Sequence, residues 1–270
     1  MDNTSPIVKA GAIALALVVA LPGAVQAQGD RLASQFTLEI LKPPFDNTGL
    51  LNSTLWLGYD TKLSDTVMLN VHLPISIFDP DISGAEGEIG VGNPYIGILR
   101  GLSVSSLFQS IGVALPTTSE ANENALWVGR VADANRFWFY VPDRLTIESV
   151  FHYWPSSKSG LYSFAGGGIA IMIPTDEGRE TEVFFPFYVG VSRGINSTTI
   201  SAGIDGRYYL TAGKHADFED VLSYQAVLRA ELAVGRIRPG IKLGFPLDTR
   251  WKNSMDGRII IGMYLRVLSE

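Results

Sequence analysis

Basic side chains recur at alternate positions in the last third of the chain. Rows of Lys and Arg attract anions, and the planar guanidinium of Arg binds a carboxylate through two parallel hydrogen bonds. Only two acidic residues, Asp205 and Glu231, share the register of these basic residues. The chemistry open to this region is therefore the binding and guiding of anions. The basic residues concerned are Arg207, Arg229, Arg236, Arg238, Lys242, Arg258 and Arg266.

The same charges are also explained by ion pairs that only hold strands together. Arg207 with Glu231, or Arg229 with Asp205, would tie neighbouring strands across a filled interior, because buried charges need partners. Such pairing would use only two of the seven basic residues. Both interpretations therefore stay open.

A second charged group shares one face of the segment 143–154, where Arg144 and Glu148 alternate with His152 at even spacing. Arg144 and Glu148 join the candidate pore-lining residues. The chain has three His and no Cys, and none of the His occurs in a recognisable Ser/His/acid set. It contains no HExxH and no phosphate-binding loop. We therefore expect no catalytic residue, no metal site and no cofactor.

The segment 116–142 is the longest candidate connection and is rich in aromatic residues. Connections of this length are usually functional or disordered. It contains Trp127, Arg130, Phe137 and Trp138, which is too apolar a set for a loop that stays in water. We expect it to fold into the mouth of a pore as a constriction or an apolar access site. The alternative is that its C-terminal part only lengthens the next strand.

Strands must position these side chains, because apolar residues alternate with polar ones throughout the chain after Ser34. In the first segment, for example, Phe36, Leu38 and Ile40 alternate with polar residues. Period-two alternation predicts strands with one apolar and one polar face. The predicted strands are 34–41, 53–62, 65–74, 94–101, 104–115, 143–154, 160–172, 181–192, 198–210, 220–234, 236–246 and 257–268.

The connections between these strands alternate between long and short. The long ones are 42–52, 75–93, 116–142, 173–180, 211–219 and 247–256. Long loops at one end and tight turns at the other are typical of outer-membrane barrels, whose strands need about 9–11 residues to cross a bilayer. A soluble β-sandwich has no reason to sort its loops in this way. The fold class predicted is all-β, a transmembrane antiparallel up-and-down β-barrel of about 12 strands.

Composition agrees with this class. Hydrophobic residues make up 46% of the 270 residues and charged residues 18%, yet no apolar run beyond the N-terminus approaches 18 residues. A closed barrel can expose an apolar surface to lipid because all its backbone groups are paired. The net charge of −6 provides no basic surplus for phosphates, so we expect no nucleic-acid partner.

The N-terminus has the features of a secretory signal peptide. An apolar run of about a dozen residues follows Lys9, and small residues end at Ala27. The run is short for a membrane anchor, which needs about 20 residues. We expect cleavage after Ala27, a signal peptide over 1–27, a barrel domain over 28–270, and export to the outer membrane of a Gram-negative cell.

Partners follow from this location. The last strand has Gly262, Leu265 and Val267 in an order that resembles the terminal-strand signal of barrel assembly. We expect contacts with the secretion and barrel-assembly machinery, with outer-membrane lipids and lipopolysaccharide, and with a small-molecule solute. Acidic residues of the connection 75–93 either form a solvated rim or bridge to lipopolysaccharide through divalent cations. Aromatic residues near strand ends, Tyr59, Tyr153, Tyr162 and Phe185 among them, are candidates for interface girdles.

One stretch, Gly87–Gly97 followed by Ala114–Thr117, resembles a known bacterial group. The group is the outer-membrane transporter family of the phenol-degradation meta-pathway, which carries G-x-G-D-x-x-x-G and a later L-P-T-G. Here Asn93 replaces the Asp and Thr118 replaces the Gly. The resemblance covers about 35 residues, and it implies a barrel that assists the passage of hydrophobic or aromatic compounds.

The function predicted is an outer-membrane channel or transporter for passive passage of small solutes, with aromatic and anionic ones as the candidates. We expect it not to be an enzyme. Two alternatives stay open: an enzyme embedded in the outer membrane, with its polar residues clustered at one rim, and a closed structural or adhesion barrel, with all its interior charges paired.

Overall fold

A computed structural model describes residues 33–43, 52–79, 87–102, 106–118, 120–155, 160–211, 221–248 and 259–269. The expected signal peptide and its cleavage site lie outside these residues. Among the residues described, no helix is long and apolar enough to cross a membrane.

Strands dominate the structure. They are β1 (Gln35–Lys42), β2 (Ser53–Ser64), β3 (Val67–Phe78), β4 (Glu88–Val91), β5 (Tyr95–Gly101), β6 (Leu107–Ala114), β7 (Arg144–Tyr153), β8 (Leu161–Pro174), β9 (Glu182–Ile195), β10 (Thr198–Tyr209), β11 (Leu222–Leu232), β12 (Ile237–Pro246) and β13 (Ile260–Leu268). The 3-10 helix η1 (Glu120–Asn122), the α-helix α2 (Glu123–Ala132) and the 3-10 segment η2 (Ala134–Tyr140) lie between β6 and β7.

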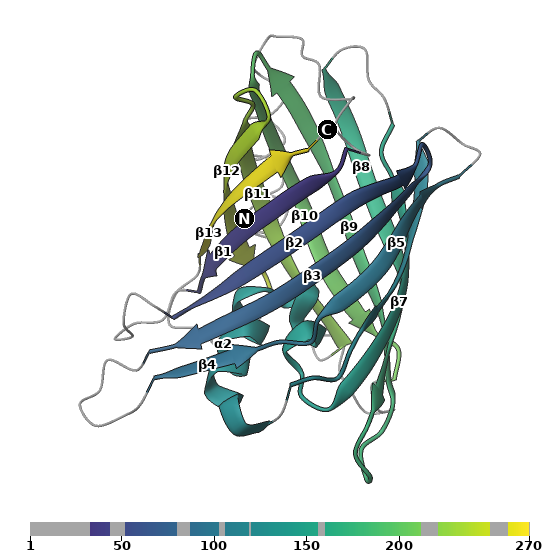
Figure 1. Cartoon of the computed structure of the whole chain (residues 1–270), viewed down its shortest axis with the longest axis vertical. Helices are drawn as coiled ribbons and strands as arrows, with labels where there is room; N and C mark the ends of the chain where they lie inside the picture. The colour runs from purple at the N-terminus through teal and green to yellow at the C-terminus, as the bar shows by residue number, and fades with distance from the viewer. Residues whose placement is uncertain are drawn as a thin grey trace, which may run out of the picture.

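The strands form one closed antiparallel barrel (Figure 1). Closure comes from β1, which pairs with β2 on one side and with β13 on the other. The short strand β4 pairs with β3 over 75–78, and β5 pairs with β3 over 67–72, so β4 and β5 share one place in the wall. The barrel therefore has twelve strand positions, and the predicted fold class is confirmed.

Each of the twelve predicted strands is present, with one addition. Strand β4 lies in the segment 75–93, which alternation assigned to a connection, and β3 itself continues to Phe78. Pro74 marks the point where the partner of β3 changes from β5 to β4. Proline has no backbone N–H to donate to the ladder, so it sits naturally at such a break.

The two faces of the wall differ as the alternation requires. Large apolar side chains are exposed on the outside, for example Phe36, Ile98 and Ile261, while Thr37 and Glu39 of β1 face the lumen. Tyr59, Tyr153 and Phe185 of the expected aromatic girdle are also exposed. Tyr162 is an exception. It lines the interior, because it shares the inward register of β8.

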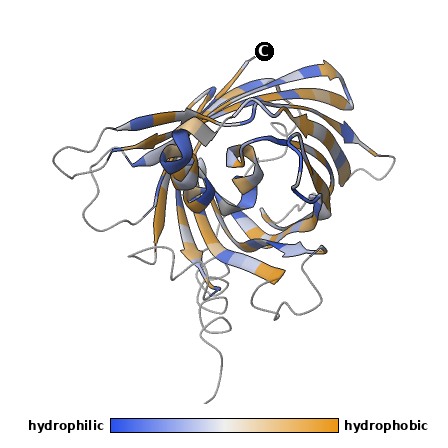
Figure 2. Ribbon diagram, turned by 90° about the horizontal axis from the view of Figure 1, so that it is seen from below, coloured by the Kyte–Doolittle hydropathy of each residue, from blue (hydrophilic) through white to orange (hydrophobic). Residues whose placement is uncertain are grey.

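Two ends of the barrel can be told apart. We call the end with the tight turns β2–β3, β9–β10 and β11–β12 the hairpin end, and the other end, where β1 ends and β2 begins, the plug end. The plug, defined as α2 and η2, lies inside the ring of strands (Figure 2) and near the plug end (Figure 1). The segment 116–142 thus folds into the barrel. It does not lengthen β7, which begins at Arg144.

Candidate functional site

The lumen between the plug and the hairpin end contains a cavity of about 530 Å³. Its wall comes from β1, β8 and β10 to β13, and its floor from the plug. The lining residues are Thr37, Glu39, Asp133, Asn135, Arg136, Tyr162, Ser197, Thr199, Ser201, Arg229, Glu231, Ala233, Arg238, Lys242, Tyr264 and Arg266. Five basic side chains face three acidic ones, so the cavity carries a net positive charge.

Strand alternation explains why these side chains meet. Arg238, Gly240 and Lys242 share the inward face of β12, and Tyr264 lies opposite Gly240 in β13. A Cβ on Gly240 would lie 2.2 Å from Cζ of Tyr264. Only glycine therefore lets the ring lie flat against the wall, which keeps the cavity open between Arg238 and Lys242.

Glu39 is the centre of the charge network at the floor of the cavity. Nη2 of Arg136 donates a hydrogen bond to Oε2 of Glu39 at 2.6 Å, and Nζ of Lys242 lies 3.4 Å from Oε1. Arg136 also pairs with Asp133, and its guanidinium lies 4.0 Å from the ring centre of Trp56. One carboxylate thus joins the wall strands β1 and β12 to the plug.

Arg136 stays charged in this setting. Burial opposes its charge, but the carboxylates of Asp133 and Glu39 outweigh that effect, so the pKa of Arg136 lies above its ordinary value. An ion pair of this kind is costly to break from one side only, because the partner left behind is a buried charge. The Glu39–Arg136 contact therefore fixes the plug to the wall as long as both partners remain.

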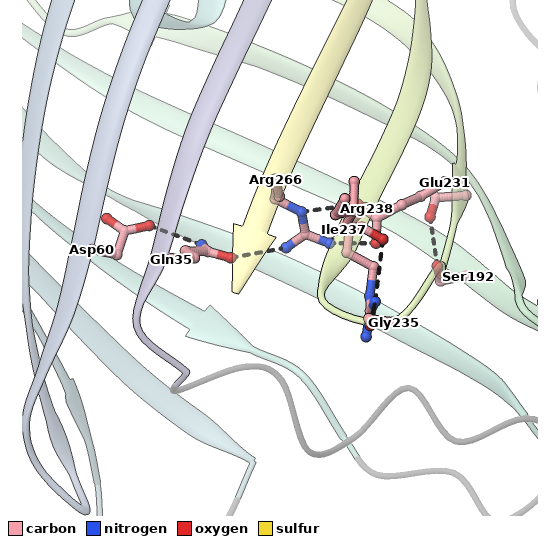
Figure 3. Close-up of polar contacts among 9 residues, drawn as sticks. Gln35, Asp60, Ser192, Glu231, Gly235, Ile237, Arg238 and Arg266 are labelled. Atoms are coloured by element: carbon pink, nitrogen blue, oxygen red, sulfur yellow. Dashed lines mark hydrogen bonds and ion pairs between the residues drawn. The ribbon is translucent and has the colours of Figure 1, made fainter. Parts of the chain in front are cut away.

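A second network crosses the hairpin end of the barrel (Figure 3). Nε of Arg266 donates to Oε2 of Glu231 at 2.9 Å, and Nη1 of Arg266 lies 3.4 Å from Oε1 of Gln35. Nε2 of Gln35 donates in turn to Asp60 at 2.8 Å. Arg266 and Glu231 thus neutralise each other within the wall.

Arg229 differs from the other basic residues of the cavity. It is exposed, although it belongs to the inward face of β11, and it makes no hydrogen bond or ion pair with any described residue. Its charge acts on the carboxylates of Glu39 and Asp205 from a distance. Arg229 is therefore a cation that faces the lumen without a direct partner among the described side chains.

The two ion pairs that the alternative interpretation of the sequence offered are not formed. Arg207 lies opposite Ser223 and Glu231 opposite Thr199, eight positions apart along β10, or about 26 Å at the usual strand rise. Arg229 lies opposite Ser201, four positions from Asp205, or about 13 Å. Glu231 pairs with Arg266 instead.

Arg207 contacts the plug rather than the cavity. Its guanidinium lies 4.0 Å from the ring centre of Phe137, and its Nε donates to the hydroxyl of Tyr209 at 2.8 Å. A cation over an aromatic ring is attracted by the ring face. Of the eight candidate pore-lining residues, the structure thus brings four together in the cavity: Arg229, Arg238, Lys242 and Arg266.

The other candidates lie elsewhere. Arg144 is buried at the plug end, where it donates to the carbonyl oxygen of Glu180 at 2.6 Å and pairs with Glu182 at 3.4 Å. Glu148 is half-buried next to the hydroxyl of Tyr95. Arg258 lies outside the described residues.

The plug residues predicted as a constriction divide into two groups. Phe137 and Trp138 are buried, and their ring centres lie 5.5 and 5.0 Å from that of Phe184 in the wall. Trp127 is exposed on α2, and Arg130 is half-buried on the same helix, where burial lowers its pKa. The aromatic pair therefore packs against the wall, and its role in a constriction stays a prediction.

Two apolar clusters surround the plug. The larger joins Leu126 and η2 to wall residues of β2, β5, β6, β8 and β9, and the smaller joins Val131 and Ala132 to Leu41 of β1 and Ile260 of β13. Within the described part of the chain, the plug thus contacts the wall on opposite sides.

Asn93 anchors the plug, a role that the sequence did not reveal. The residue is fully buried at the break between β4 and β5. Its Oδ1 accepts hydrogen bonds from the backbone N–H of Thr117 at 3.1 Å and from Oγ1 of Thr118 at 2.9 Å, and its Nδ2 donates to the carbonyl of Val141 at 2.8 Å. Asn93 and Thr118, the two departures from the family pattern, are thus in contact.

The backbone at the same break also receives the plug. The N–H of Asn93 donates to the carbonyl oxygen of Phe139 at 2.6 Å. A Cβ on Gly92 would lie 2.6 Å from that oxygen, so a side chain there would push η2 away. The Gly-Asn step was visible in the sequence as part of a motif, and the motif positions the plug.

Three further residues carry the site and were not predicted as such: Glu39, Asp133 and Arg136. Alternation did place Glu39 on the polar face of its strand. Asp133 and Arg136 gave no signal, because nothing in a connection's sequence says which side chains will face a lumen.

A separate group in the lumen joins His152 to Ser110 at 2.8 Å and to the hydroxyl of Tyr188 at 2.6 Å. A Ser/His/acid set would have a carboxylate where this group has the hydroxyl of Tyr188.

Among the described residues, no cluster of three or more His, Asp or Glu is arranged to hold a metal ion.

The chain matches no protein-family model, and no curated protein matches it in sequence. Solved structures do share its architecture. The COG4313 outer membrane channel from Pseudomonas putida F1 matches with a TM-score of 0.60 and 11% identity, over 91% of this chain and 100% of that one. The fold is that of a Gram-negative outer-membrane β-barrel. LpxR from Salmonella typhimurium matches with a TM-score of 0.53 and 11% identity, over 87% of this chain and 100% of that one. At these identities the likeness concerns the fold alone.

Proposed function

We propose that this outer-membrane barrel is a gated channel for the passive passage of small anionic solutes. The observation that carries the proposal is the positively charged cavity, in which Arg229 is exposed to the lumen and makes no direct pair with a described residue. A purely structural barrel would be expected to pair or remove such a charge, since unpaired charges add nothing to its stability. Basic lumen side chains favour anions in a narrow pore.

The plug makes this a channel that has to open. Two apolar clusters hold it against the wall at the plug end, and in the proposed mechanism the docked plug blocks the way from the cavity to that end. No energy-coupling domain is part of the proposal, and flow is downhill. In this proposal the signal peptide 1–27 directs export of the chain, and the barrel-assembly machinery inserts the barrel into the outer membrane. Lipids and lipopolysaccharide then contact the exposed apolar band.

Ion selectivity of the refolded protein in a planar bilayer tests the proposal. We expect discrete conductance steps with a reversal potential on the anion side, and more frequent openings in Asn93→Ala, which loosens the plug. Arg229→Gln should shift the reversal potential toward zero selectivity. The matched control is Arg100→Gln: Arg100 is exposed on the outer face near the hairpin end and bonds only to Gln109 across the ladder.

Two results would overturn the proposal. One is silence of both the wild type and Asn93→Ala when heat-modifiable migration shows that each is folded, which would favour a closed structural barrel. The other is a reversal potential on the cation side in all variants, which would leave a channel whose selectivity is unrelated to the cavity.

A further inference from the structure

The carboxylate of Glu39 occupies a position that is built to bind a carboxylate. Its two oxygens are divided between Arg136 of the plug, at 2.6 Å, and Lys242 of β12, at 3.4 Å. Both cations are themselves largely buried, and the charge of Arg229 reaches the same group. Three cations from three elements thus converge on one anionic group.

This position is accessible from the cavity. Glu39, Arg136, Lys242 and Arg229 all line it, and its volume of about 530 Å³ is within the range of small-ligand pockets, about 300–1,000 Å³. Arg229 is the most exposed cation of the group. An anion that enters from the hairpin end would pass Arg238 and Arg266, which lie opposite each other near the turn, and would then reach Arg229 and Lys242, which lie opposite each other further in.

The neighbouring side chains suit an organic anion. The hydroxyl-bearing residues Thr37 and Ser201 and the rings of Tyr162 and Tyr264 complete the lining. Aromatic side chains offer both apolar contact and a polar tip. A carboxylate attached to a compact apolar body fits this combination better than a bare inorganic ion.

We propose that Glu39 is an internal stand-in for the ligand, and that a small organic carboxylate entering the cavity takes its place on Arg136 and Lys242 and so releases the plug. The solute is then both the cargo and the signal for opening. This inference rests on the proposed channel function, which it deepens by naming the solute class and the opening step.

The two cations keep a carboxylate partner in such an exchange. Breaking the Glu39 contacts alone would leave buried cations unpaired, which is costly. Replacing one carboxylate by another leaves Arg136 and Lys242 each with a partner, and Arg136 also retains Asp133. A ligand shifts the plug toward release only as far as it binds the released state more tightly than the docked one. Glu39, displaced into the cavity, no longer links β1 to the plug.

Binding to the refolded full chain in detergent tests the inference without any conductance measurement. Benzoate is the carboxylate probe, benzyl alcohol its neutral counterpart, and inorganic phosphate the non-carboxylate anion. Calorimetry should show benzoate binding and no benzyl alcohol binding. Arg229→Gln should weaken benzoate binding by about twofold to fivefold, as expected for the loss of a nearby charge that makes no direct hydrogen bond, while Arg100→Gln should not.

Glu39→Gln separates the stand-in role from simple attraction. Without the internal competitor, benzoate should bind more tightly and the plug should be released more often, seen as faster hydrogen exchange in α2. Glu39→Asp, which keeps the charge on a shorter side chain, should lie between the wild type and Glu39→Gln, and it serves if Glu39→Gln fails to fold.

The outcomes distinguish this inference from the proposed function. If benzoate affinity changes as expected in these variants but the protein has no channel activity, the proposed channel function is overturned and the binding site is supported. If conductance is anion-selective but benzoate does not bind, or binds equally well in Glu39→Gln and Glu39→Asp, the binding site is overturned and the channel function is supported. Equal affinity for phosphate and benzoate would overturn the carboxylate assignment.

Discussion

The two halves of the lumen are built by the same strands and yet have opposite characters. Toward the plug end, the inward positions hold large buried side chains such as Trp56, Tyr95 and Phe184, and the plug covers them. Toward the hairpin end, inward positions of β10 to β13 hold Ser, Arg and Lys side chains around a cavity. The difference shows that a barrel wall fixes only which side chains face inward. What fills the lumen depends on whether a chain segment folds back onto them.

The interactions that hold the plug differ in the same way. On the side of β5 and β9, neutral hydrogen bonds of Asn93 and aromatic packing of Trp138 hold it. On the side of β1 and β12, a single carboxylate, Glu39, holds it through ion pairs. We expect the first side to act as a hinge and the second as the contact that opens. The variants that follow test this contrast.

Trp138→Ala should have the largest effect. Removing a buried aromatic residue costs about 3–5 kcal/mol, and here the loss falls on plug docking because Trp138 packs on Phe184 and Phe139. Hydrogen exchange should speed up in α2 and η2 and not in the strands. Trp127→Ala, at an exposed position of the plug, is the control and should change exchange little. Equal effects of the two would contradict the assignment of the plug core.

Asn93→Ala should have the next largest effect. It removes the acceptor of Thr117 and Thr118 and the donor to Val141, at a cost of about 2–3 kcal/mol if two of these groups remain buried and unpaired. The expected result is a plug that leaves the lumen while the barrel keeps its heat-modifiable migration. If the barrel unfolds together with the plug, the two are not separate units.

Gly240→Ala should have a moderate effect on the open half. The added methyl group would force the ring of Tyr264 into the cavity, at a cost of about 1–3 kcal/mol in stability to heat. Single-channel conductance should fall as the ring narrows the lumen. Gly101→Ala is a matched control, because a Cβ added there would lie 3.8 Å from the nearest atoms, which is ordinary contact. A conductance unchanged by Gly240→Ala would show that the permeation path avoids this cavity.

Arg229→Gln should have the smallest effect on stability, within about 0.5 kcal/mol, because Arg229 is exposed and forms no ion pair with a described residue. Its effect should appear in anion selectivity. Arg266→Gln breaks the pair with Glu231 and should cost more stability than Arg229→Gln. Thermal unfolding of both variants measures the difference, and a reversed order would mean that Arg229 is a structural residue.

The strands were predictable because the environment imposes a period of two. Because lipid lies outside the barrel and solvent inside, Phe36 and Ile40 face outward, and Thr37 and Glu39 face inward. This alternation can be recognised from neighbouring residues in the sequence. The inward direction of Arg229, Arg238, Lys242 and Arg266 follows from the same rule. Strand β4 was not predicted, because its four residues, Glu88 to Val91, are too few for alternation to distinguish a strand from a loop.

The plug was only partly predictable. Its aromatic content indicated that the segment 116–142 would not remain in water, but a helix was not predicted within it. In α2 the buried residues recur at helical spacing, while Glu123, Asn124 and Trp127 are exposed, and the helix is only ten residues long. The buried residues are Ala125, Leu126, Val128, Gly129, Val131 and Ala132. The partners of the charges were not predictable at all. Arg266 meets Glu231 across an intervening strand, and Arg136 meets Glu39 at a distance of 97 positions in the chain.

The sequence by itself determined the class of fold, the twelve strand positions and the inward direction of the basic side chains, since each is set by interactions between residues near in the chain and their surroundings. Only the tertiary structure decided that the plug enters the barrel, that Asn93 receives it, and that Glu39 unites Arg136 and Lys242. Those contacts exist only after the sheet closes and its register brings distant strands to the same level, and closure is a property of the whole chain.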